Sequence, residues 1–452
     1  MPEPRVPAMT PVMPMNEGAA MNLALPRRRV LGAAARNMLW LSVDKAVAVV
    51  LGLLVFGLIA RILGPEGAGR FSYAVAVLQS TLGMSLVCSA AAVLPRLCRM
   101  TDGLACRAVG NVFVVRMGGS VLAALLAAAY VALTVDDPQR RLITLVMLAA
   151  VPLIEPFHAF AAYWQSRNDN RPLFVARGGG LLARLLLVLG ALWLGAPVWV
   201  LALAWVLEAG LAALLQMRGI SRARPWPVIV RAVTRLRTRL YFRYAVRFTG
   251  GLLLAHLFLR LDRLWLAERM GAQEFGLYAT AMQLVEVWLQ VALLLGGSIA
   301  PAFLYRDLQR STALRSHVRV IAGFAGLGLA GWLGAFLFGP WLLVTVFGPA
   351  FAGSQGYLLA GFGAAVLFFI DQFAQISITA TNRPGLLALK WSAACATTAA
   401  VLLLATPWLG AFAGPAGLAG GIVAGWLAMA LAPNRPARAR PLSHAPSPTL
   451  EV

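Results

Sequence analysis

The sequence has few charged residues and almost no lysine. Only 12% of its 452 residues are charged, whereas 60% are hydrophobic and the mean hydropathy is +0.76. A water-soluble fold could not keep so large an apolar fraction away from solvent, so the soluble classes are excluded. Lysine occurs only at Lys45 and Lys390, and the net charge of +22 therefore comes almost entirely from arginine. The composition predicts a protein that crosses a membrane many times.

The sequence also lacks the patterns of the common enzyme classes. It has four histidines and no Walker A, nucleophile-elbow, zinc-protease or dinucleotide-binding pattern, and no connection is long enough for an active site. Its four cysteines form no C-x-x-C pair, so we interpret them as small apolar side chains in a reduced setting rather than as metal ligands. We expect a protein that is not an enzyme and needs no cofactor.

Apolar segments long enough to cross a bilayer, which takes about 20 residues, recur along the chain. The sequence predicts an all-α protein with twelve transmembrane helices in two six-helix bundles. The predicted spans cover residues 36–60, 71–95, 108–134, 141–164, 173–195, 197–217, 243–268, 276–304, 317–346, 353–381, 386–408 and 413–432. The bundles then occupy 36–217 and 243–432, with a basic linker at 218–242 and disordered ends at 1–35 and 433–452.

Arginine clusters in every second connection, which indicates topology rather than binding of nucleic acid. The N-terminal flank, the connections after the second, fourth, sixth and eighth spans, and the C-terminal tail are all basic. Because cytoplasmic loops carry the excess of basic residues, both termini are expected in the cytoplasm. The connection between the bundles holds nine arginines from Arg218 to Arg247. It is interpreted as a topology anchor, with recruitment of anionic lipid headgroups as the alternative.

A short glycine motif occurs twice, 207 residues apart, each time between two apolar segments. The matched residues are Gly64, Gly69, Phe71 and Ala74 in the first copy and Gly271, Gly276, Tyr278 and Ala281 in the second. Tight turns between packed helices favour glycine because it has no Cβ atom. The repeat predicts two related halves. With six spans in each half, they are expected to be parallel repeats about an axis along the membrane normal.

Arginines lie inside the predicted spans, where a charge costs about 2.5–3.5 kcal/mol at the bilayer centre. Because this many charges cannot all face lipid, they are expected to line a shared water-filled interior. The candidates for binding cargo are Arg116, Arg184, Arg260 and Arg263. Guanidinium groups suit phosphate oxygens, which implies an anionic cargo and makes pyrophosphate a natural candidate. The alternatives for each arginine are a structural ion pair or a side chain that reaches an interface.

Acidic residues inside the spans have a different predicted role. A membrane carboxylate with a raised pKa can bind and release a proton or Na⁺, and so couple cargo movement to an ion gradient. The candidates are Glu155, Glu208, Glu286 and Asp371. The alternative is that they neutralise neighbouring arginines.

Two regions resemble a known family. Asn37 to Leu94, with ARILGPEGAGRFSYA at its centre, resembles the first two helices of Wzx-type polysaccharide (O-antigen) flippases. Arg243 to Pro301, with GLYATAMQLVEVW, resembles their seventh and eighth helices. These flippases belong to the multidrug/oligosaccharidyl-lipid/polysaccharide exporter superfamily. The resemblance implies a V-shaped pair of bundles that alternate access to a central cationic cavity.

The resemblance also implies a function. The family's cargo is an undecaprenyl-pyrophosphate-linked oligosaccharide, moved from the inner to the outer leaflet of the bacterial cytoplasmic membrane for cell-surface or exopolysaccharide synthesis. Membrane lipids, a polysaccharide polymerase and export machinery are the implied partners, and nucleic acid is not. Twelve spans argue against the fourteen-helix lipid II flippases. The alternatives are a cation-coupled drug antiporter, which favours an acidic and aromatic cavity, and a membrane polymerase, which usually needs a large extracytoplasmic loop.

Overall fold

A computed structural model describes residues 27–86, 88, 90–98, 100–167, 169–223, 229, 231, 233–299, 314–380 and 383–432. Within these ranges the regular structure is helical and contains no strand. The sequence predicts disordered ends at 1–35 and 433–452. Residues 1–26 and those after 432 lie outside the described residues, whereas residues 27–35 form the first turns of a helix that begins at Arg27.

The helices divide into two consecutive halves. The first half contains α1 (Arg27–Met84), α2 (Ala90–Leu97), α3 (Asp102–Thr134), α4 (Pro138–Leu148), α5 (Val151–Ile154), α6 (His158–Ser166), α7 (Arg171–Trp193) and α8 (Val198–Ala223). The second half contains α10 (Arg235–Phe258), α11 (Leu261–Arg269), α12 (Ala272–Ile299), α14 (Leu314–Phe347), η3 (Pro349–Ser354), α15 (Gln355–Ala380), α16 (Pro384–Leu409), η4 (Gly410–Phe412) and α17 (Ala413–Leu431).

The predicted twelve-helix layout is confirmed. Among the described residues, nine segments are long and apolar enough to cross a membrane. Two of them contain a turn and hold two crossings each: α1 turns at Gly64, and the segment Pro384–Leu431 turns at Gly410. Both glycines have positive φ angles, 66° and 54°, which residues with a Cβ atom rarely adopt. The short apolar helix Thr249–Phe258, continued by α11, supplies the twelfth crossing.

Three of the predicted spans are interrupted. The fourth span is divided into α4, α5 and α6, and Pro152 and Pro156 explain the division because proline has no backbone N–H to donate. The second span ends as a helix at Met84 before α2 resumes it. The seventh is interrupted between α10 and α11, where Arg260 leaves the helical conformation. Each interruption leaves backbone carbonyl groups without their usual helical donors.

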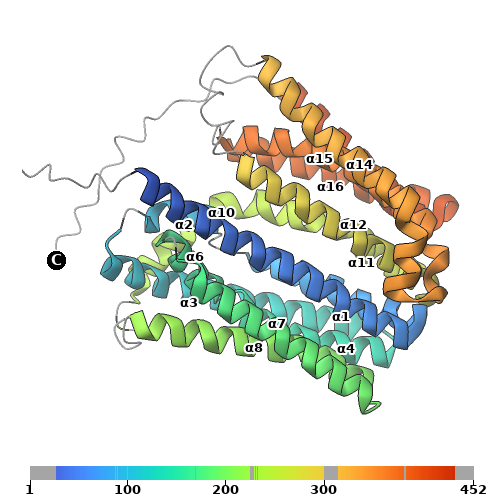
Figure 1. The fold of residues 1–452 in the computed structure, drawn as a ribbon, viewed down its shortest axis with the longest axis horizontal. Coiled ribbons are helices and arrows are strands. Elements are labelled where there is room, and N and C mark those ends of the chain that lie inside the picture. The colour runs from blue at the N-terminus through green and yellow to red at the C-terminus, as the bar shows by residue number, and fades with distance from the viewer. Residues whose placement is uncertain are drawn as a thin grey trace, which may run out of the picture.

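Figure 1 shows the halves side by side, the first in blue to green and the second in yellow to red. Helices α1 and α12 pack against each other along the junction. Toward the end where α1 begins, α14 diverges from the first half; at the opposite end the halves meet. A hydrophobic core crosses the junction there, with the buried side chains of Ile59 and Phe275 among its members.

The two copies of the glycine motif contact each other where the halves meet. A Cβ atom on Gly276 would overlap the carbonyl oxygen of Pro65, and one on Gly69 would overlap the carbonyl oxygen of Ala272. Pro65 and Ala272 are separated by the same 207 residues as Gly69 and Gly276. The contact is therefore self-complementary, as expected for two repeats about a pseudo-twofold axis. We call these four residues the glycine contact, and this end of the molecule the closed end.

Candidate functional site

Charged side chains reinforce the closed end. Arg140, in α4, donates to the carbonyl oxygen of Ala267 at 3.0 Å and forms an ion pair with Glu268 at 3.0 Å. Its guanidinium group also lies over the ring of Tyr73, 4.5 Å from the centroid. Arg140 and Glu268 come from opposite halves and are partly exposed, so water screens their attraction. The pair adds a polar connection beside the backbone contact of the glycines.

A second arginine connects α1 to the end of α14. Arg61 donates from Nε to the carbonyl oxygen of Val346 at 3.2 Å and from Nη2 to that of Val344 at 3.4 Å and to that of Thr345. Carbonyl groups at the end of a helix have no intrahelical donor, so a guanidinium group stabilises them. Separation of the halves at this end would break these hydrogen bonds.

The loop before α4 holds an ionised carboxylate at the same end. Asp137 accepts hydrogen bonds from the backbone N–H groups of Gln139 and Arg140, and Arg70 pairs with it at 2.8 Å. Burial would raise the pKa of Asp137, but these hydrogen bonds outweigh it and the pKa is lowered. Asp137 therefore caps α4 in its charged form and holds Arg140 near the junction.

We expect the Arg140–Glu268 pair to be exchangeable. Arg140→Glu alone places two carboxylates together and should weaken the closed end, whereas Arg140→Glu combined with Glu268→Arg restores opposite charges. Because exposed pairs contribute about 0–1 kcal/mol, which is at most about fivefold in an equilibrium constant, the single reversal should lower export by up to about fivefold. Export of surface polysaccharide by the single and double variants is the measurement. A double variant as impaired as the single one would show that the ion pair is unimportant.

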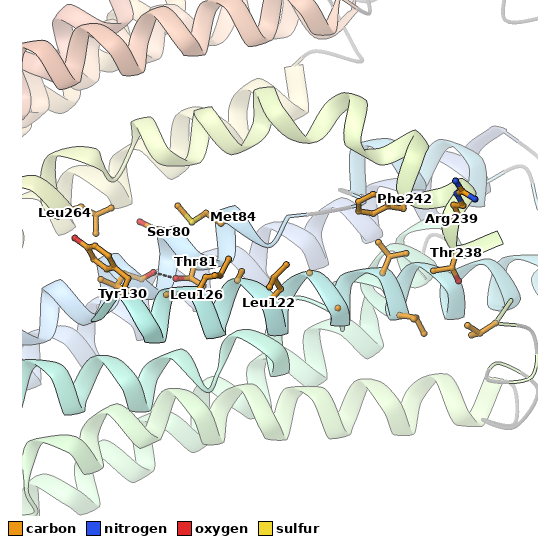
Figure 2. A pocket seen from close by; sticks show the side chains of 18 of the residues that line it. Ser80, Thr81, Met84, Leu122, Leu126, Tyr130, Thr238, Arg239, Phe242 and Leu264 are labelled. Carbon is orange, nitrogen blue, oxygen red and sulfur yellow. Dashed lines mark hydrogen bonds between the residues drawn. The ribbon is translucent and has the colours of Figure 1, made fainter. Parts of the chain in front are cut away.

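A cavity of about 1330 Å³ lies between the halves, beside α1, α3 and the start of α10 (Figure 2). Its walls are mostly apolar and come from the second part of α1, one face of α3, residues 233–242 and Leu264 of α11. The polar and charged residues that line it are Tyr73, Ser80, Thr81, Tyr130, Thr238, Arg235 and Arg239. None of the eight charged residues predicted from the sequence lines this cavity, although the structure describes all of them.

Each predicted arginine has a carboxylate partner instead. Arg116 pairs with Glu155 at 2.9 Å in the first half, and Arg184 pairs with Glu208 at 2.7 Å in the same half. In the second half, Arg260 and Arg263 share one carboxylate, that of Glu286. Three of the four predicted acids are therefore paired with the predicted arginines, which is the arrangement of the ion-pair alternative.

Arg116 is enclosed by helix interruptions. Its side chain is 3% exposed, and it donates to the carbonyl oxygens of Cys88 and Glu155, both at 3.1 Å, as well as to the Glu155 carboxylate. Cys88 lies where the second span is interrupted, and Glu155 lies where α5 ends. His158 lies with Nδ1 2.9 Å from the other carboxylate oxygen of Glu155. The guanidinium group thus donates to backbone carbonyl groups at two of the helix interruptions.

The remaining pairs each have aromatic or backbone support. Arg184 lies over the ring of Trp205, 4.5 Å from the centroid. Arg263 donates to the carbonyl oxygen of Met282 at 3.2 Å in addition to its bond with Glu286. The neighbouring Asp262 is buried and accepts a hydrogen bond from the hydroxyl of Tyr278, the aromatic residue of the second glycine motif. Such support holds each charge within its own half.

Asp371 has a partner that the sequence interpretation missed. Lys390 donates to its Oδ2 atom at 2.6 Å, and Trp426 donates to Oδ1 at 2.8 Å, with both charged side chains 1% exposed. A signal was available, because Lys390 falls inside the predicted span 386–408 and needs a carboxylate to be buried there. Arg235 and Arg239 were also missed as cavity residues, since the basic connection was interpreted as an anchor.

Comparison with known proteins agrees with this architecture. The sequence profile described as polysaccharide biosynthesis protein matches residues 34–305, more than half of the chain. No curated protein sequence matches the chain. The structure of lipid II flippase MurJ in an inward closed conformation gives a TM-score of 0.67 at 11% identity, over 86% of each chain.

Transporters of the MATE family have the same fold. An inward-facing multidrug resistance transporter of the MOP superfamily gives a TM-score of 0.61 at 14% identity, over 87% of this chain and 96% of that one. The Vibrio cholerae transporter VcmN gives 0.58 at 13% identity, over 88% and 95%. At such identities these likenesses establish the fold alone. The family follows from the profile match over residues 34–305: the chain belongs to the polysaccharide biosynthesis protein family.

Proposed function

We propose that this protein is a flippase that moves a polyprenyl-pyrophosphate-linked oligosaccharide from the inner to the outer leaflet of the bacterial cytoplasmic membrane. One observation carries the proposal: two repeat-related halves meet through a self-complementary glycine contact at one end and border a large, open cavity between them. The glycine contact joins backbone atoms of different halves, so it can separate without unfolding either half. Membership of a polysaccharide biosynthesis family supports a saccharide cargo. The protein provides a path and catalyses no covalent step.

The arginine distribution sets the orientation in this proposal. With both termini in the cytoplasm, the closed end faces the outside of the cell, and the end where α1 begins faces the cytoplasm. The described conformation is then the state that receives cargo from the inner leaflet. Opening the closed end while the other end closes would release the cargo outside, for surface or exopolysaccharide synthesis.

The paired charges suggest how an ion gradient drives the cycle. Glu286 holds both Arg260 and Arg263. A phosphate group and the Glu286 carboxylate would compete for these guanidinium groups, so protonation of Glu286 would free them for cargo. Arg184 with Glu208, and Arg116 with Glu155, offer the same competition in the first half. The assignment of the four arginines to cargo, and of Glu155, Glu208, Glu286 and Asp371 to a coupling proton or Na⁺, stays a prediction.

Complementation tests the function. Expression of the protein in a strain without its own flippase should restore surface polysaccharide and remove the lipid-linked units that accumulate on the cytoplasmic side. Arg260→Ala and Arg184→Ala should lower export by about tenfold or more, because each removes a charged hydrogen-bond donor. Membrane abundance of each variant is the control. Failure of the parent protein to restore export contradicts the flippase, whereas normal export by both variants contradicts only the arginine assignment.

A further inference from the structure

We propose that the groove between α3 and α10 binds a lipid with a diphosphate head and a single long apolar chain, with the head at Arg235 and Arg239. The site rests on the proposed function, because the cargo of a flippase for lipid-linked saccharides must present both parts to the protein. Neither arginine is among the four charged residues that the sequence indicated for cargo.

The groove has the length of a lipid chain. On α3 its lining runs from Val114 to Tyr130 in alternating steps of one and three residues, which places these side chains on one helix face. This stretch rises about 24 Å at about 1.5 Å per residue, most of the roughly 30 Å hydrocarbon thickness of a bilayer. Drug-sized ligands occupy pockets of about 300–1000 Å³, whereas this cavity has about 1330 Å³. The groove suits an extended chain better than a compact molecule.

The wall of the groove is apolar and unfilled. Leu122 and Leu126 line it and are 59% and 63% exposed, so no protein side chain covers them. Gly118 also lines it, and a Cβ atom there would meet no other atom within 4 Å. Gly118, Ala123 and Ala127, which also line the cavity, are small residues beside the leucines. An apolar chain would cover this surface, and burial of apolar area is favourable.

Both basic residues lie at one end of the groove. Arg235 and Arg239 line the cavity four residues apart on α10, and both side chains are exposed. Figure 2 shows Arg239 near Thr238 and Phe242 at one end, with Tyr130 and Leu264 at the other. Among the described residues, no carboxylate pairs with Arg235 or Arg239. They differ in this from the four intramembrane arginines, and their charge is available to an anion.

The protein holds this end of α10 in place against α3. The Oδ1 atom of buried Asn111 accepts hydrogen bonds from the backbone N–H of Thr234 and the hydroxyl of Thr238, both at 3.1 Å. A Cβ atom on Gly110 would lie 2.9 Å from the carbonyl oxygen of Ile229, so the connection before α10 also packs closely on α3. Asn111 is thus a positioning residue for the two arginines. A mere topology anchor would not need this attachment to the cavity wall.

The charges and the apolar wall together identify the occupant. A phosphate or diphosphate group would bind the guanidinium groups of Arg235 and Arg239, and its chain would lie along α3 toward Tyr130. A free anion would leave the apolar wall uncovered, and a neutral lipid would leave the arginines unpaired. Ordinary anionic phospholipids share the chemistry of the head, so the experiment must separate them from a prenyl diphosphate.

Binding to the full-length protein in phosphatidylcholine nanodiscs tests the site. The probes are a long-chain prenyl diphosphate, the prenol of the same chain, and inorganic pyrophosphate. We expect the prenyl diphosphate to bind at least about tenfold more tightly than either other probe, because each of those fills half of the site. Arg235→Gln with Arg239→Gln should weaken the binding of prenyl diphosphate by roughly tenfold per arginine. The same double variant should leave the binding of prenol unchanged.

Matched variants distinguish a loss of binding at the groove from a general effect on charge or folding. Arg231→Gln removes an exposed arginine of the same connection that does not line the cavity, and it should bind like the parent. Gly118→Trp should fill the groove and weaken both prenyl probes but not pyrophosphate, whereas Gly118→Ala should not. Arg235→Lys with Arg239→Lys should retain part of the binding if glutamine perturbs folding. Unchanged prenyl diphosphate binding in the glutamine variant, or an equal loss in Arg231→Gln, overturns the site.

Three further outcomes distinguish the proposed site from the proposed function and from a site for membrane phospholipid. Loss of prenyl diphosphate binding when phosphatidylglycerol replaces part of the phosphatidylcholine would assign the groove to ordinary anionic lipid and overturn the proposal. Restored export by a glutamine variant that still binds the probe overturns the groove and leaves the flippase. Binding that depends on both arginines, in a parent protein that restores no polysaccharide, supports the groove and overturns the flippase.

Discussion

Gly276→Leu is expected to open the closed end and nearly abolish export. Any Cβ atom at this position would overlap the carbonyl oxygen of Pro65, which belongs to the backbone of the other half. A side-chain rotation cannot relieve an overlap with backbone, so the halves must separate. Overpacking of this kind costs about 1–3 kcal/mol or more, which would shift the two-state equilibrium by roughly tenfold to a hundredfold. A protein that cannot close this end cannot return to receive cargo.

The position of the halves can be measured along with export. Ile59 is fully buried in the core at the closed end, and Ile59→Cys should react with a membrane-impermeant maleimide only after the halves separate. Cys98, the exposed native cysteine, is replaced by serine in this background. Gly276→Leu should label Ile59→Cys much faster than the parent does. Export should fall by at least about tenfold.

Two further variants are the controls, one at the equivalent glycine of the other repeat and one at a glycine with no neighbouring atoms near its Cβ position. Gly69→Leu should have the same effect as Gly276→Leu, because its Cβ atom would overlap the carbonyl oxygen of Ala272 in the equivalent position. Gly178→Leu, in α7, should leave labelling and export unchanged, since a Cβ atom there meets nothing within 4 Å. Normal export with Gly276→Leu would show that the glycine contact is not part of the cycle.

The glycine repeat could be predicted from the sequence, but the glycine contact could not. The offset of 207 residues predicted two related halves and a need for glycine, and both follow from the sequence itself. That the copies would pack on each other did not follow, because a repeat indicates similar structures without indicating their contact. A turn at Gly64 and close approach at Gly69 are different reasons for glycine, and only coordinates separate them.

Hydropathy predicted the number of crossings but not the interruptions or the pairs. Hydropathy is averaged over a window of residues, so it does not detect the breaks in the helices near Cys88 and Glu155. The proline residues of the fourth span were the available signal. The pairing of Lys390 with Asp371 joins neighbouring helices, and no rule of helical spacing connects their positions. Arg235 and Arg239 were interpreted as part of a topology anchor, because the α3 wall of the cavity beside them lies more than a hundred residues earlier in the chain.

Arg116→Met should reduce the amount of folded protein, rather than its affinity for cargo alone. The change removes the ion pair with Glu155 and the donors to the carbonyl oxygens of Cys88 and Glu155, all of them buried. Removing one partner of a buried pair costs about 3–5 kcal/mol, a large part of the roughly 5–15 kcal/mol that stabilises a typical fold. Thermal unfolding in detergent and membrane abundance are the measurements.

A set of related variants distinguishes a structural arginine from a cargo-binding one. Arg116→Lys keeps the charge, but one ammonium group cannot reach acceptors on both sides as the planar guanidinium does, so it should restore little stability. Glu155→Gln should also destabilise, and its effect combined with Arg116→Met should be smaller than the sum, because both remove the same pair. Arg231→Met, at an exposed position, should unfold like the parent. If Arg116→Met stays folded and loses only cargo binding, the guanidinium group serves the cargo, and the helix interruptions must be stabilised by other donors.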